Sequence, residues 1–556
     1  MKKEYFIPII MAVCTIVGVL IGTFCANHFA GDRLQIINSG SSRLTNLLHV
    51  IDNQYVDAVD IDSLVDKAIP QILGELDPHS VYIPAAEAKQ AEDELKGSFS
   101  GIGIEFVIRE DTIRVQNVIS NGPSERAGLL SGDKIVSVDG KPFVGKTITN
   151  DIAMKTLKGP KDSRVKIGVL RYGSKKEKVY EITRGNVVQH SITSTYMIDD
   201  NTGYIKVRNF GENTYPEFLA SLAELSQNNA ENLIIDLRDN TGGLLQAAVL
   251  MANEFLEKDQ MIVYTEGRKS PREDITADGR GAYRQIPLVV LINEISASAS
   301  EIFAGAIQDN DRGTIIGRRS FGKGLVQQQL SFTDGSLLRL TIARYYTPSG
   351  RCIQKPYVPG TSMKYEEDLL NRYANGELYS ADSIHNKGKA FKTSLGRTVY
   401  DGGGITPDIF VPEDTLGMTS YYKEAAMSGF IMQYAYEYTD YNRQKLKEFT
   451  NEVALDQYLA KQPLVHKFVV FAEKKGLQRR NLMIEKSRKL FKRYLHSRII
   501  YNMLNENALM KYLNADDQII KAAIDLFSEG KARPTKTTAF FSTSPHSAGK
   551  FNIMRA

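Results

Sequence analysis

Residues 286–327 constrain the fold more tightly than any other part of the chain. They begin with a nearly unbroken apolar run, IPLVVLI, which predicts a strand buried on both faces of a sheet. The sequence SASASE follows at 296–301, and serine is a residue type that commonly starts a helix. Apolar residues then recur at helical spacing, at Ile302, Phe303, Ala306 and Ile307. The stretch therefore predicts a strand that leads directly into a helix, with a small hydroxyl at the helix N-terminus.

This junction is suited to nucleophilic chemistry. Free backbone N–H groups and the positive end of a helix dipole can stabilise an oxyanion. A further predicted strand at 314–317 runs into SFGKG at 320–324, where the glycines let the backbone bring Lys323 close to another element. A serine hydroxyl needs a base to take its proton, and a partly desolvated lysine can be neutral enough to serve. A serine and a lysine could therefore act together.

The residues alone leave two simpler interpretations open. Serine-rich sequences are common at helix N-termini, so the SASASE run could be only a cap. Lys323 could be only a solvated loop charge. No histidine lies between Ser298 and Gln327, so the stretch itself gives no sign of a Ser-His-Asp triad.

The whole stretch from 296 to 327 resembles the active-site region of the carboxy-terminal processing (tail-specific) proteases, which are serine peptidases with a Ser-Lys dyad. The resemblance implies that Ser298 is the nucleophile and that Lys323 is its base. It also implies that Gln327, four residues after Lys323, orients the lysine. The match is long and is far more specific than an isolated short motif.

The rest of the catalytic core is expected at 186–412. A buried strand at 232–238 ends in DNTGG, and alternating strands and helices indicate an α/β core. By resemblance this core is crotonase/ClpP-like, and its LRxNxGG turn supplies an oxyanion-hole amide from Gly242 or Gly243, opposite the N–H of Ala299. The resemblance covers residues 40–412 and fails beyond Pro412.

Residues 97–184 predict a β-rich domain inserted before the core, and their pattern of strands, glycines and short helices resembles a PDZ domain. The resemblance places GIGI in the carboxylate-binding loop, and backbone N–H groups around glycines can hold a peptide's terminal carboxylate while the peptide adds as a strand. Met154 and Leu157, on a helix predicted at 150–157, are either walls of the pocket or simply core. The predicted peptide-binding residues are Gly101, Ile102, Gly103, Ile104, Met154 and Leu157.

The N-terminal part predicts a membrane segment followed by helices. About 20 apolar or small residues follow Lys2 and Lys3, which is enough to cross a bilayer. We expect residues 1–28 to be an uncleaved signal anchor rather than a removed signal peptide, because the residues before Cys25 make a poor cleavage site. The lysines place the body across the bacterial inner membrane, in the periplasm. Residues 40–95 predict a helical segment, in which His79 is a loop residue without a chemical role.

The C-terminal part predicts a helical region at 413–530 and a disordered tail at 533–556. Basic residues between 474 and 498 alternate with apolar residues at helical spacing. This pattern is more typical of an amphipathic bundle with a solvated face than of a nucleic-acid surface.

Composition adds few constraints on function. The net charge of +4 over 556 residues does not indicate nucleic acid or lipid partners, and three cysteines offer no disulfide framework. We expect no cofactor and no metal, and the sequence leaves homo-oligomer formation open. The favoured function is a membrane-anchored serine endopeptidase that captures free protein C-termini. The alternatives are an inactive binding scaffold of the same fold and, less favoured, an acyl-CoA enzyme of crotonase type.

Overall fold

The structure is a computed structural model that describes residues 40–109, 111–171, 173–384, 388–536, 541–542 and 552–553. It divides into two compact units, Met1–Ile72 and Leu73–Ala556. In the described ranges, no helix has both the length and the apolar character needed to span a bilayer. The predicted anchor, residues 1–28, lies outside those ranges.

The helical N-terminal segment is present. Its elements are α2 (Gly40–Gln54), α3 (Ile61–Gly74) and α4 (Ala85–Lys96), with the short strand β1 (Val81–Ile83) before α4. Asp60 marks the start of α3, since its carboxylate accepts from the Ser63 N–H at 3.3 Å.

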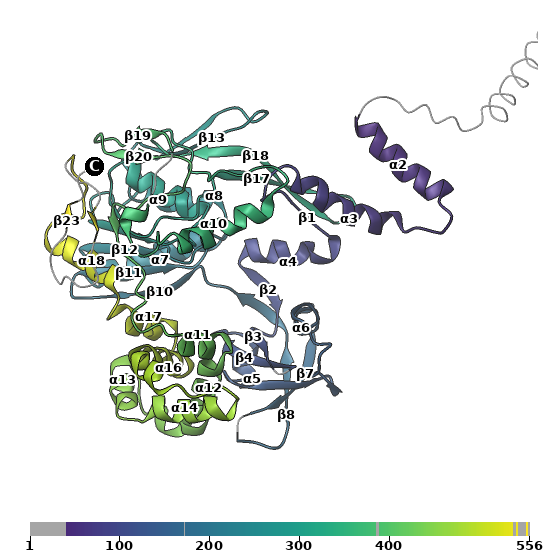
Figure 1. The fold of residues 1–556 in the computed structure, drawn as a ribbon, viewed down its shortest axis with the longest axis vertical. Coiled ribbons are helices and arrows are strands. Elements are labelled where there is room, and N and C mark those ends of the chain that lie inside the picture. Colours follow the sequence, from purple (N-terminus) through teal and green to yellow (C-terminus); the bar gives the residue numbers. More distant parts are fainter. Residues whose placement is uncertain are drawn as a thin grey trace, which may run out of the picture. The chain divides into compact units, whose positions relative to one another are not determined.

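An eight-stranded sheet forms the core of the larger unit (Figure 1). Its six inner strands, β11 to β22, run parallel, and β10 and β23 pair antiparallel at the two edges. In spatial order the strands are β10 (Ile192–Met197), β11 (Thr202–Val207), β12 (Asn232–Asp236), β15 (Leu288–Ile292), β16 (Thr314–Gly317), β21 (Ile409–Phe410), β22 (Phe541–Ser542) and β23 (Asn552–Ile553).

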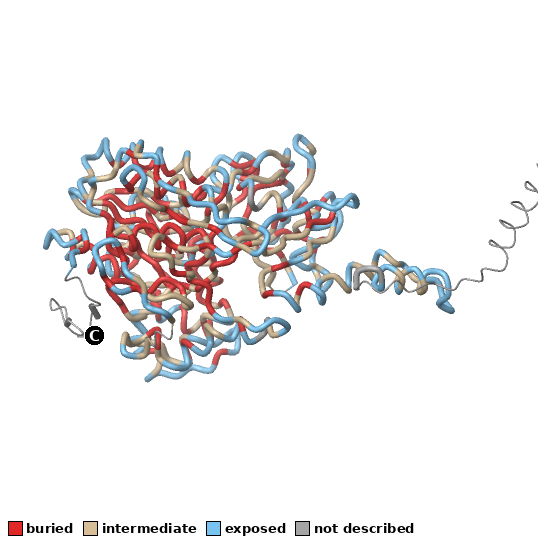
Figure 2. Tube along the Cα trace, turned by 90° about the horizontal axis from the view of Figure 1, so that it is seen from above, coloured by how far each residue is buried: buried red, intermediate tan, exposed pale blue. Residues whose placement is uncertain are grey.

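Both faces of this sheet are covered, as the apolar run of β15 predicts. Leu288, Val290 and Ile292 point to one hydrophobic cluster, and Val289 and Leu291 point to another. The first cluster includes apolar side chains from α7 (Thr214–Gln227), α8 (Leu245–Asn253) and α9 (Ala299–Asp309). The second is covered by α18 (Gln518–Ser528) from the predicted C-terminal region. Figure 2 shows the buried residues concentrated in this core.

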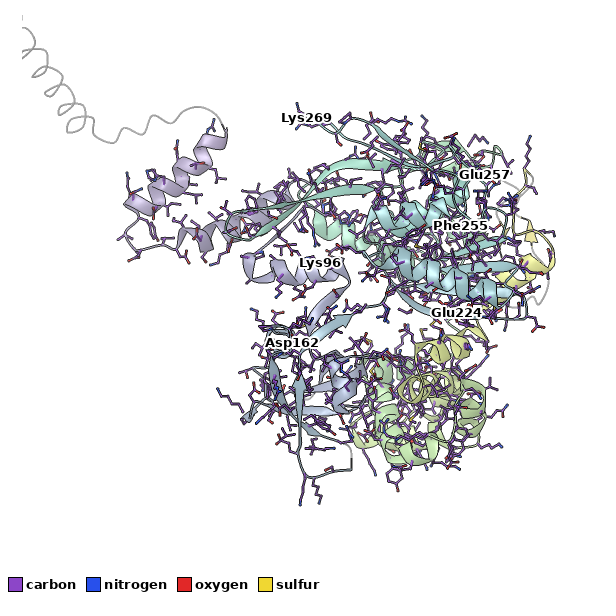
Figure 3. All side chains as sticks on the ribbon, turned by 180° about the vertical axis from the view of Figure 1, so that it is seen from behind. Lys96, Asp162, Glu224, Phe255, Glu257 and Lys269 are labelled. Carbon is purple, nitrogen blue, oxygen red and sulfur yellow. The ribbon has the colours of Figure 1, made fainter. Side chains whose placement is uncertain are left out.

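Aromatic packing ties the helices of the first face together. Phe255, just after α8, is fully buried and meets Phe218 of α7 and Phe303 of α9, each at a centroid distance of 6.1 Å. Figure 3 labels Phe255 within this layer, whereas Lys269 marks the outer end of the hairpin formed by β13 (Met261–Glu266) and β14 (Glu273–Thr276).

A second sheet carries the loop predicted to hold the catalytic lysine. Its order is β1-β18-β13-β14, with β17 paired to β18. The bounds are β13 (Met261–Glu266), β14 (Glu273–Thr276), β17 (Leu325–Ser331) and β18 (Leu337–Tyr346). β17 begins two residues after Lys323, so the antiparallel pairing with β18 fixes where that loop ends.

Residues 97–184 form the expected inserted β-domain. The ribbon of β2 (Ser98–Gly101) and β9 (Gly185–Val188) leads into and out of it. Its sheet has the order β3-β4-β5-β7-β8, so β3 is an edge strand that a peptide could extend. Its elements are β3 (Ile104–Arg109), β4 (Thr112–Val118), α5 (Pro123–Ala127), β5 (Lys134–Val138), β6 (Lys141–Pro142), α6 (Asn150–Leu157), β7 (Arg164–Leu170) and β8 (Lys178–Thr183).

The C-terminal helices pack around their own apolar core, as an amphipathic bundle should. Two hydrogen bonds join these helices to the inserted β-domain: the Tyr436 hydroxyl donates to the Gln116 carbonyl at 3.2 Å, and Arg109 donates to the carbonyl of Ser428, which lies between the first two helices, at 2.8 Å. The helices are α11 (Ser420–Met427), α12 (Phe430–Leu446), α13 (Glu452–Ala460), α14 (Leu464–Lys474), α15 (Asn481–Lys486), α16 (Arg488–Met503) and α17 (Glu506–Asn514).

Of residues 533–556, for which the sequence predicts a disordered tail, the structure describes 533–536, 541–542 and 552–553. The described pieces β22 and β23 are ordered strands that extend the core sheet beyond β21, whose open edge offers main-chain hydrogen bonds.

Candidate active site

Ser298 lies at the N-terminus of α9, after the loop that follows β15, and its backbone has φ 55° and ψ −114°. Every other non-glycine residue with positive φ in the described ranges is Asp or Asn, which tolerate that conformation more readily. Ser298 therefore occupies a strained turn between a strand and a helix.

Hydrogen bonds distinguish Ser298 from the two neighbouring serines. The Ser296 hydroxyl donates to the Leu237 carbonyl at 2.8 Å, and the Ser300 hydroxyl donates to the Asn240 carbonyl at 2.9 Å. Both of these serines are fully buried, whereas Ser298 is only half-buried. In the capping box of α9 the Ser298 side chain only accepts, from the Glu301 N–H, and among the described residues its hydroxyl proton has no hydrogen-bond acceptor. It is the hydroxyl of SASASE that is available for reaction.

A buried carboxylate, that of Glu301, holds the backbone on both sides of the site. Its Oε2 accepts from the N–H of Ser298 at 2.9 Å and from the N–H of Lys323 at 2.8 Å. Its Oε1 accepts from the N–H of Gly322 at 2.7 Å and from the Ser320 hydroxyl. Burial raises the pKa of Glu301 to about 7, while these donors favour its ionised form. Glu301 thus fixes the spacing of the serine turn and the lysine loop, a role that the sequence analysis does not identify.

Lys323 is partly desolvated, as a lysine base requires. Burial lowers the pKa of Lys323 below its ordinary 10.5, although the nearby charge of Glu301 acts in the opposite direction. Its Nζ donates to Gln327 Oε1 at 3.3 Å. A larger fraction of this amine is therefore neutral near pH 7 than for a solvated lysine.

Tyr345 links the two predicted dyad residues through their main chains. Its hydroxyl lies 3.1 Å from the Ser298 carbonyl oxygen and also within hydrogen-bond distance of the Lys323 carbonyl oxygen. Among the described residues, no hydrogen bond joins Ser298 Oγ to Lys323 Nζ. In free enzymes such catalytic bonds are often long and shorten when substrate binds.

His79, to which the sequence analysis assigns no role, lies beside the lysine. Its backbone carbonyl accepts a hydrogen bond from Gln327 Nε2. Burial, and then the charge of Lys323, lower the pKa of His79 to about 4, so its imidazole is neutral at physiological pH. The imidazole Nε2 lies 2.9 Å from the Tyr365 hydroxyl. His79 is a loop residue, as predicted, and its side chain is not positioned as a base for Ser298. The prediction did not include the contact of its carbonyl with Gln327.

The predicted oxyanion amides differ in their availability. The Gly242 N–H donates to Asn240 Oδ1 at 2.8 Å and is occupied. For Gly243 and Ala299, no acceptor of the N–H is recorded among the backbone bonds of the described turns and loops. Gly242 instead allows close approach, since a Cβ there would lie 2.7 Å from the Ser298 Cβ. This arrangement favours Gly243 over Gly242 as the partner of Ala299.

A cleft of about 450 Å³ in the inserted β-domain contains most of the predicted peptide-binding residues. It is lined by Ile102, Gly103, Ile104, Met154 and Leu157, and also by Phe99 and Lys158. Gly101 is not among the lining residues. Ile102 and Leu157 also belong to the hydrophobic core of the domain, so both interpretations of Leu157 hold.

Other reactive groups near the site are unsuited to nucleophilic attack. Burial raises the pKa of the Cys352 thiol, which disfavours the reactive thiolate. In the part of the chain that the structure describes, no group of three or more His, Cys, Asp or Glu side chains could hold a metal ion.

Comparison with protein families finds three matches. Residues 201–362 match peptidase family S41, and residues 100–181 match the PDZ domain. Residues 421–505 match a family of unknown function (DUF8443). The first two matches cover the candidate active site and the cleft.

Individual proteins show the same similarity. A carboxy-terminal-processing protease of Bartonella bacilliformis is 37% identical over 357 residues, which is 63% of this chain and 81% of that protein. The carboxy-terminal processing protease CtpB of Bacillus subtilis is 34% identical over 334 residues, covering 59% and 68%. Among solved structures, the photosystem II D1 C-terminal processing protease is 29% identical, with a TM-score of 0.34 over 57% of this chain and 91% of that one.

Proposed function

Because this chain belongs to the carboxy-terminal processing proteases of peptidase family S41, which are serine peptidases, we propose that it cleaves proteins with a Ser298–Lys323 dyad. The observation that carries the proposal is the shared carboxylate of Glu301, which bonds the main chain of both residues. The strained backbone of Ser298, its hydroxyl proton that has no acceptor among the described residues, and the desolvated lysine support it further.

In the first half of the reaction, the neutral Lys323 amine takes the Ser298 hydroxyl proton as Oγ bonds to the scissile carbonyl carbon. The carbonyl electron pair moves to oxygen, and the N–H groups of Ala299 and Gly243 stabilise the resulting oxyanion. Collapse of this intermediate breaks the C–N bond, and the Lys323 ammonium gives its proton to the departing amine. An acyl-enzyme on Ser298 remains.

In the second half, Lys323 takes a proton from water as the water oxygen attacks the acyl carbon. The second oxyanion collapses, the bond to Ser298 Oγ breaks, and the lysine returns the proton to Oγ. The products are a carboxylic acid and the regenerated dyad. Gln327, which accepts from Lys323 Nζ, orients the amine in both halves.

In this proposal, the C-terminus of a protein substrate binds in the cleft of the PDZ domain and pairs with the edge strand β3. The apolar residues near the N-terminus support attachment to the bacterial inner membrane, with the catalytic part in the periplasm.

The test is to incubate the part of the chain from residue 40 onward with an unfolded protein and to follow fragments by mass spectrometry. We expect cleavage by the wild type and none by Ser298→Ala. The alternative function, an inactive scaffold, predicts binding of the same protein without fragments from either form.

A further inference from the structure

The loop Asp77–Ser80 lies against the proposed base although it precedes it by more than 240 residues. The His79 carbonyl accepts from Gln327 Nε2, and a carbonyl oxygen can only accept. The amide nitrogen of Gln327 therefore faces His79, which leaves its Oε1 to accept from Lys323 Nζ at 3.3 Å. The loop thus determines which end of the Gln327 amide meets the lysine.

Asp77 holds this loop in shape. Its Oδ1 accepts from the N–H of His79 at 2.8 Å and from the N–H of Ser80 at 2.9 Å. Its Oδ2 accepts from the Ser80 hydroxyl at 2.6 Å. The Asp77 residue is 6% exposed, so its carboxylate makes these bonds largely shielded from water.

The loop is also fastened to β18, opposite Gln327. The Thr341 hydroxyl donates to Asp77 Oδ1 at 3.0 Å, and the Thr341 N–H donates to Ser80 Oγ at 3.1 Å. Thr341 is the β18 partner of Gln327 in the β17–β18 pair. Thr341 of β18 therefore contacts the loop through hydrogen bonds and is also the strand partner of Gln327.

We propose that Asp77 is a positioning residue for the catalytic base: the turn that it caps presents the His79 carbonyl to Gln327 and so directs the Gln327 oxygen to Lys323. This inference rests on the proposed function, because it takes Lys323 as the base. One hydrogen of the amine is then committed to Gln327, which restricts rotation about the Cε–Nζ bond. The segment before the PDZ domain is thereby part of the catalytic machinery.

The test compares Asp77→Ala with a matched control, Asp334→Ala. Asp334 caps a similar turn at the far end of the same hairpin, accepting from the Ser336 N–H at 2.9 Å and the Ser336 hydroxyl at 2.7 Å. We expect Asp77→Ala to lower kcat about 10- to 100-fold, the effect of a misplaced catalytic group, with KM changed little. Asp334→Ala should leave both unchanged.

The pH profile separates positioning from general damage. The charged and titratable groups that act on Lys323 are Glu301 of α9, Arg339 of β18, and Asp77 and His79 of the loop. Asp77→Ala removes a negative charge that raises the pKa of Lys323, and it releases Gln327 Oε1 from its fixed position beside Lys323 Nζ. The pKa of Lys323 should fall, so the rise of kcat/KM should move to lower pH. Asp77→Asn keeps the Oδ1 acceptor and should restore kcat to within about threefold while still moving the profile, since the charge is gone.

Each result decides one point. Wild-type kcat and pH profile in Asp77→Ala, alongside an inactive Ser298→Ala, would overturn the positioning role and leave the dyad intact. Equal losses in Asp77→Ala and Asp334→Ala, with no recovery in Asp77→Asn, would also overturn it, because they indicate general destabilisation. If the wild type itself does not cleave, the proposed function fails instead.

Discussion

Ser298 shows how a single residue is prepared for reaction by its surroundings. Its positive φ is costly for a residue other than glycine, Asp or Asn, and it persists because Glu301 and Tyr345 bond the main chain around it. The Ser298 hydroxyl donates to no group among the described residues, whereas the hydroxyls of Ser296 and Ser300 are buried and donate to main-chain carbonyls. The strained backbone conformation of Ser298 is therefore associated with a hydroxyl that is left available for reaction.

The first prediction concerns the dyad. Ser298→Ala and Lys323→Ala should each abolish peptide cleavage, and the double variant should be no slower than either single one, because nucleophile and base act as a unit. Lys323→Arg should also be inactive, since a guanidinium stays protonated. Initial rates of peptide cleavage measure all four variants.

Ser296→Ala and Ser300→Ala are the controls for that experiment. Their hydroxyls donate to main-chain carbonyls, so each substitution should lower the thermal stability of the protein. The kcat of each variant should change little. Turnover that survives in Ser298→Ala and disappears in one of these two would identify a different nucleophile.

The second prediction concerns pH. Since Lys323 must be neutral to accept the proton and burial lowers its pKa, kcat/KM should rise with pH through an apparent pKa below 10.5. Glu301→Gln should lower kcat, because an NH2 group would face two of the N–H and O–H donors. It should also move the rise to lower pH, because the charge that raises the pKa of Lys323 is gone.

His79 provides the check on this interpretation. Its pKa of about 4 keeps the imidazole neutral over the assay range, so His79→Gln should not remove any inflection. A profile governed only by a group near pH ~6.5, and lost on replacing one histidine, would return the site to a histidine-based triad.

At the scale of elements, local signals in the sequence predict much of the site. The parts of the site that the sequence does not predict depend on contacts between residues far apart in the chain. Helix α6 has the predicted bounds because Thr149 caps it, accepting from the Ile152 N–H at 3.3 Å. The loop at His79 could not be predicted in the same way, since its contact with Gln327 joins residues far apart in the sequence. The available signal was the Asp77-x-His79-Ser80 pattern of a capped turn, which alone gives no partner.

The third prediction concerns the edge strand β3 and its cleft. Amidating the C-terminus of a peptide removes the charge that the GIGI amides would hold, so binding should weaken by ~1.5–3 kcal/mol, or about 10- to 150-fold. Calorimetry and cleavage rates on the same peptide pair measure this. Equal binding and cleavage of both peptides would contradict C-terminal recognition.

Matched glycine variants locate that effect in the cleft. Gly103→Val should weaken binding of the free-acid peptide, since Gly103 lines the cleft with φ 76° and a Cβ there would lie 3.2 Å from Pro123 Cδ. Gly140→Val imposes the same backbone strain at φ 75°, but in a turn with open space around it. It should leave peptide binding unchanged.

At the scale of the whole molecule, the catalytic core extends beyond the region that resembles the family. Helix α18 covers one face of the core sheet, against Tyr204, Val289 and Leu291. Its capping residue Asp517 pairs with Arg238 at 2.6 Å, just before the oxyanion turn. The sequence predicts α18 only as one amphipathic helix among several, because its apolar stripe does not reveal which surface it covers.

The fourth prediction tests this packing. Ile520→Ala should lower the free energy of unfolding by about 2–5 kcal/mol, because Ile520 is 1% exposed between α18 and the sheet. Leu482→Ala, at a residue that is 83% exposed, should change it by less than ~0.5 kcal/mol. Urea unfolding in the Ser298→Ala background avoids self-digestion. Equal effects would show that α18 does not complete the core.

The position of α18 also has a consequence for how the protein is made. A ribosome releases residues 286–327 well before residues 518–528, so the serine and the lysine emerge while one face of their sheet is still uncovered. That face of the sheet, which includes Val289 and Leu291, is covered only after α18 has been synthesised. During synthesis these apolar side chains are therefore exposed to water or to other chains.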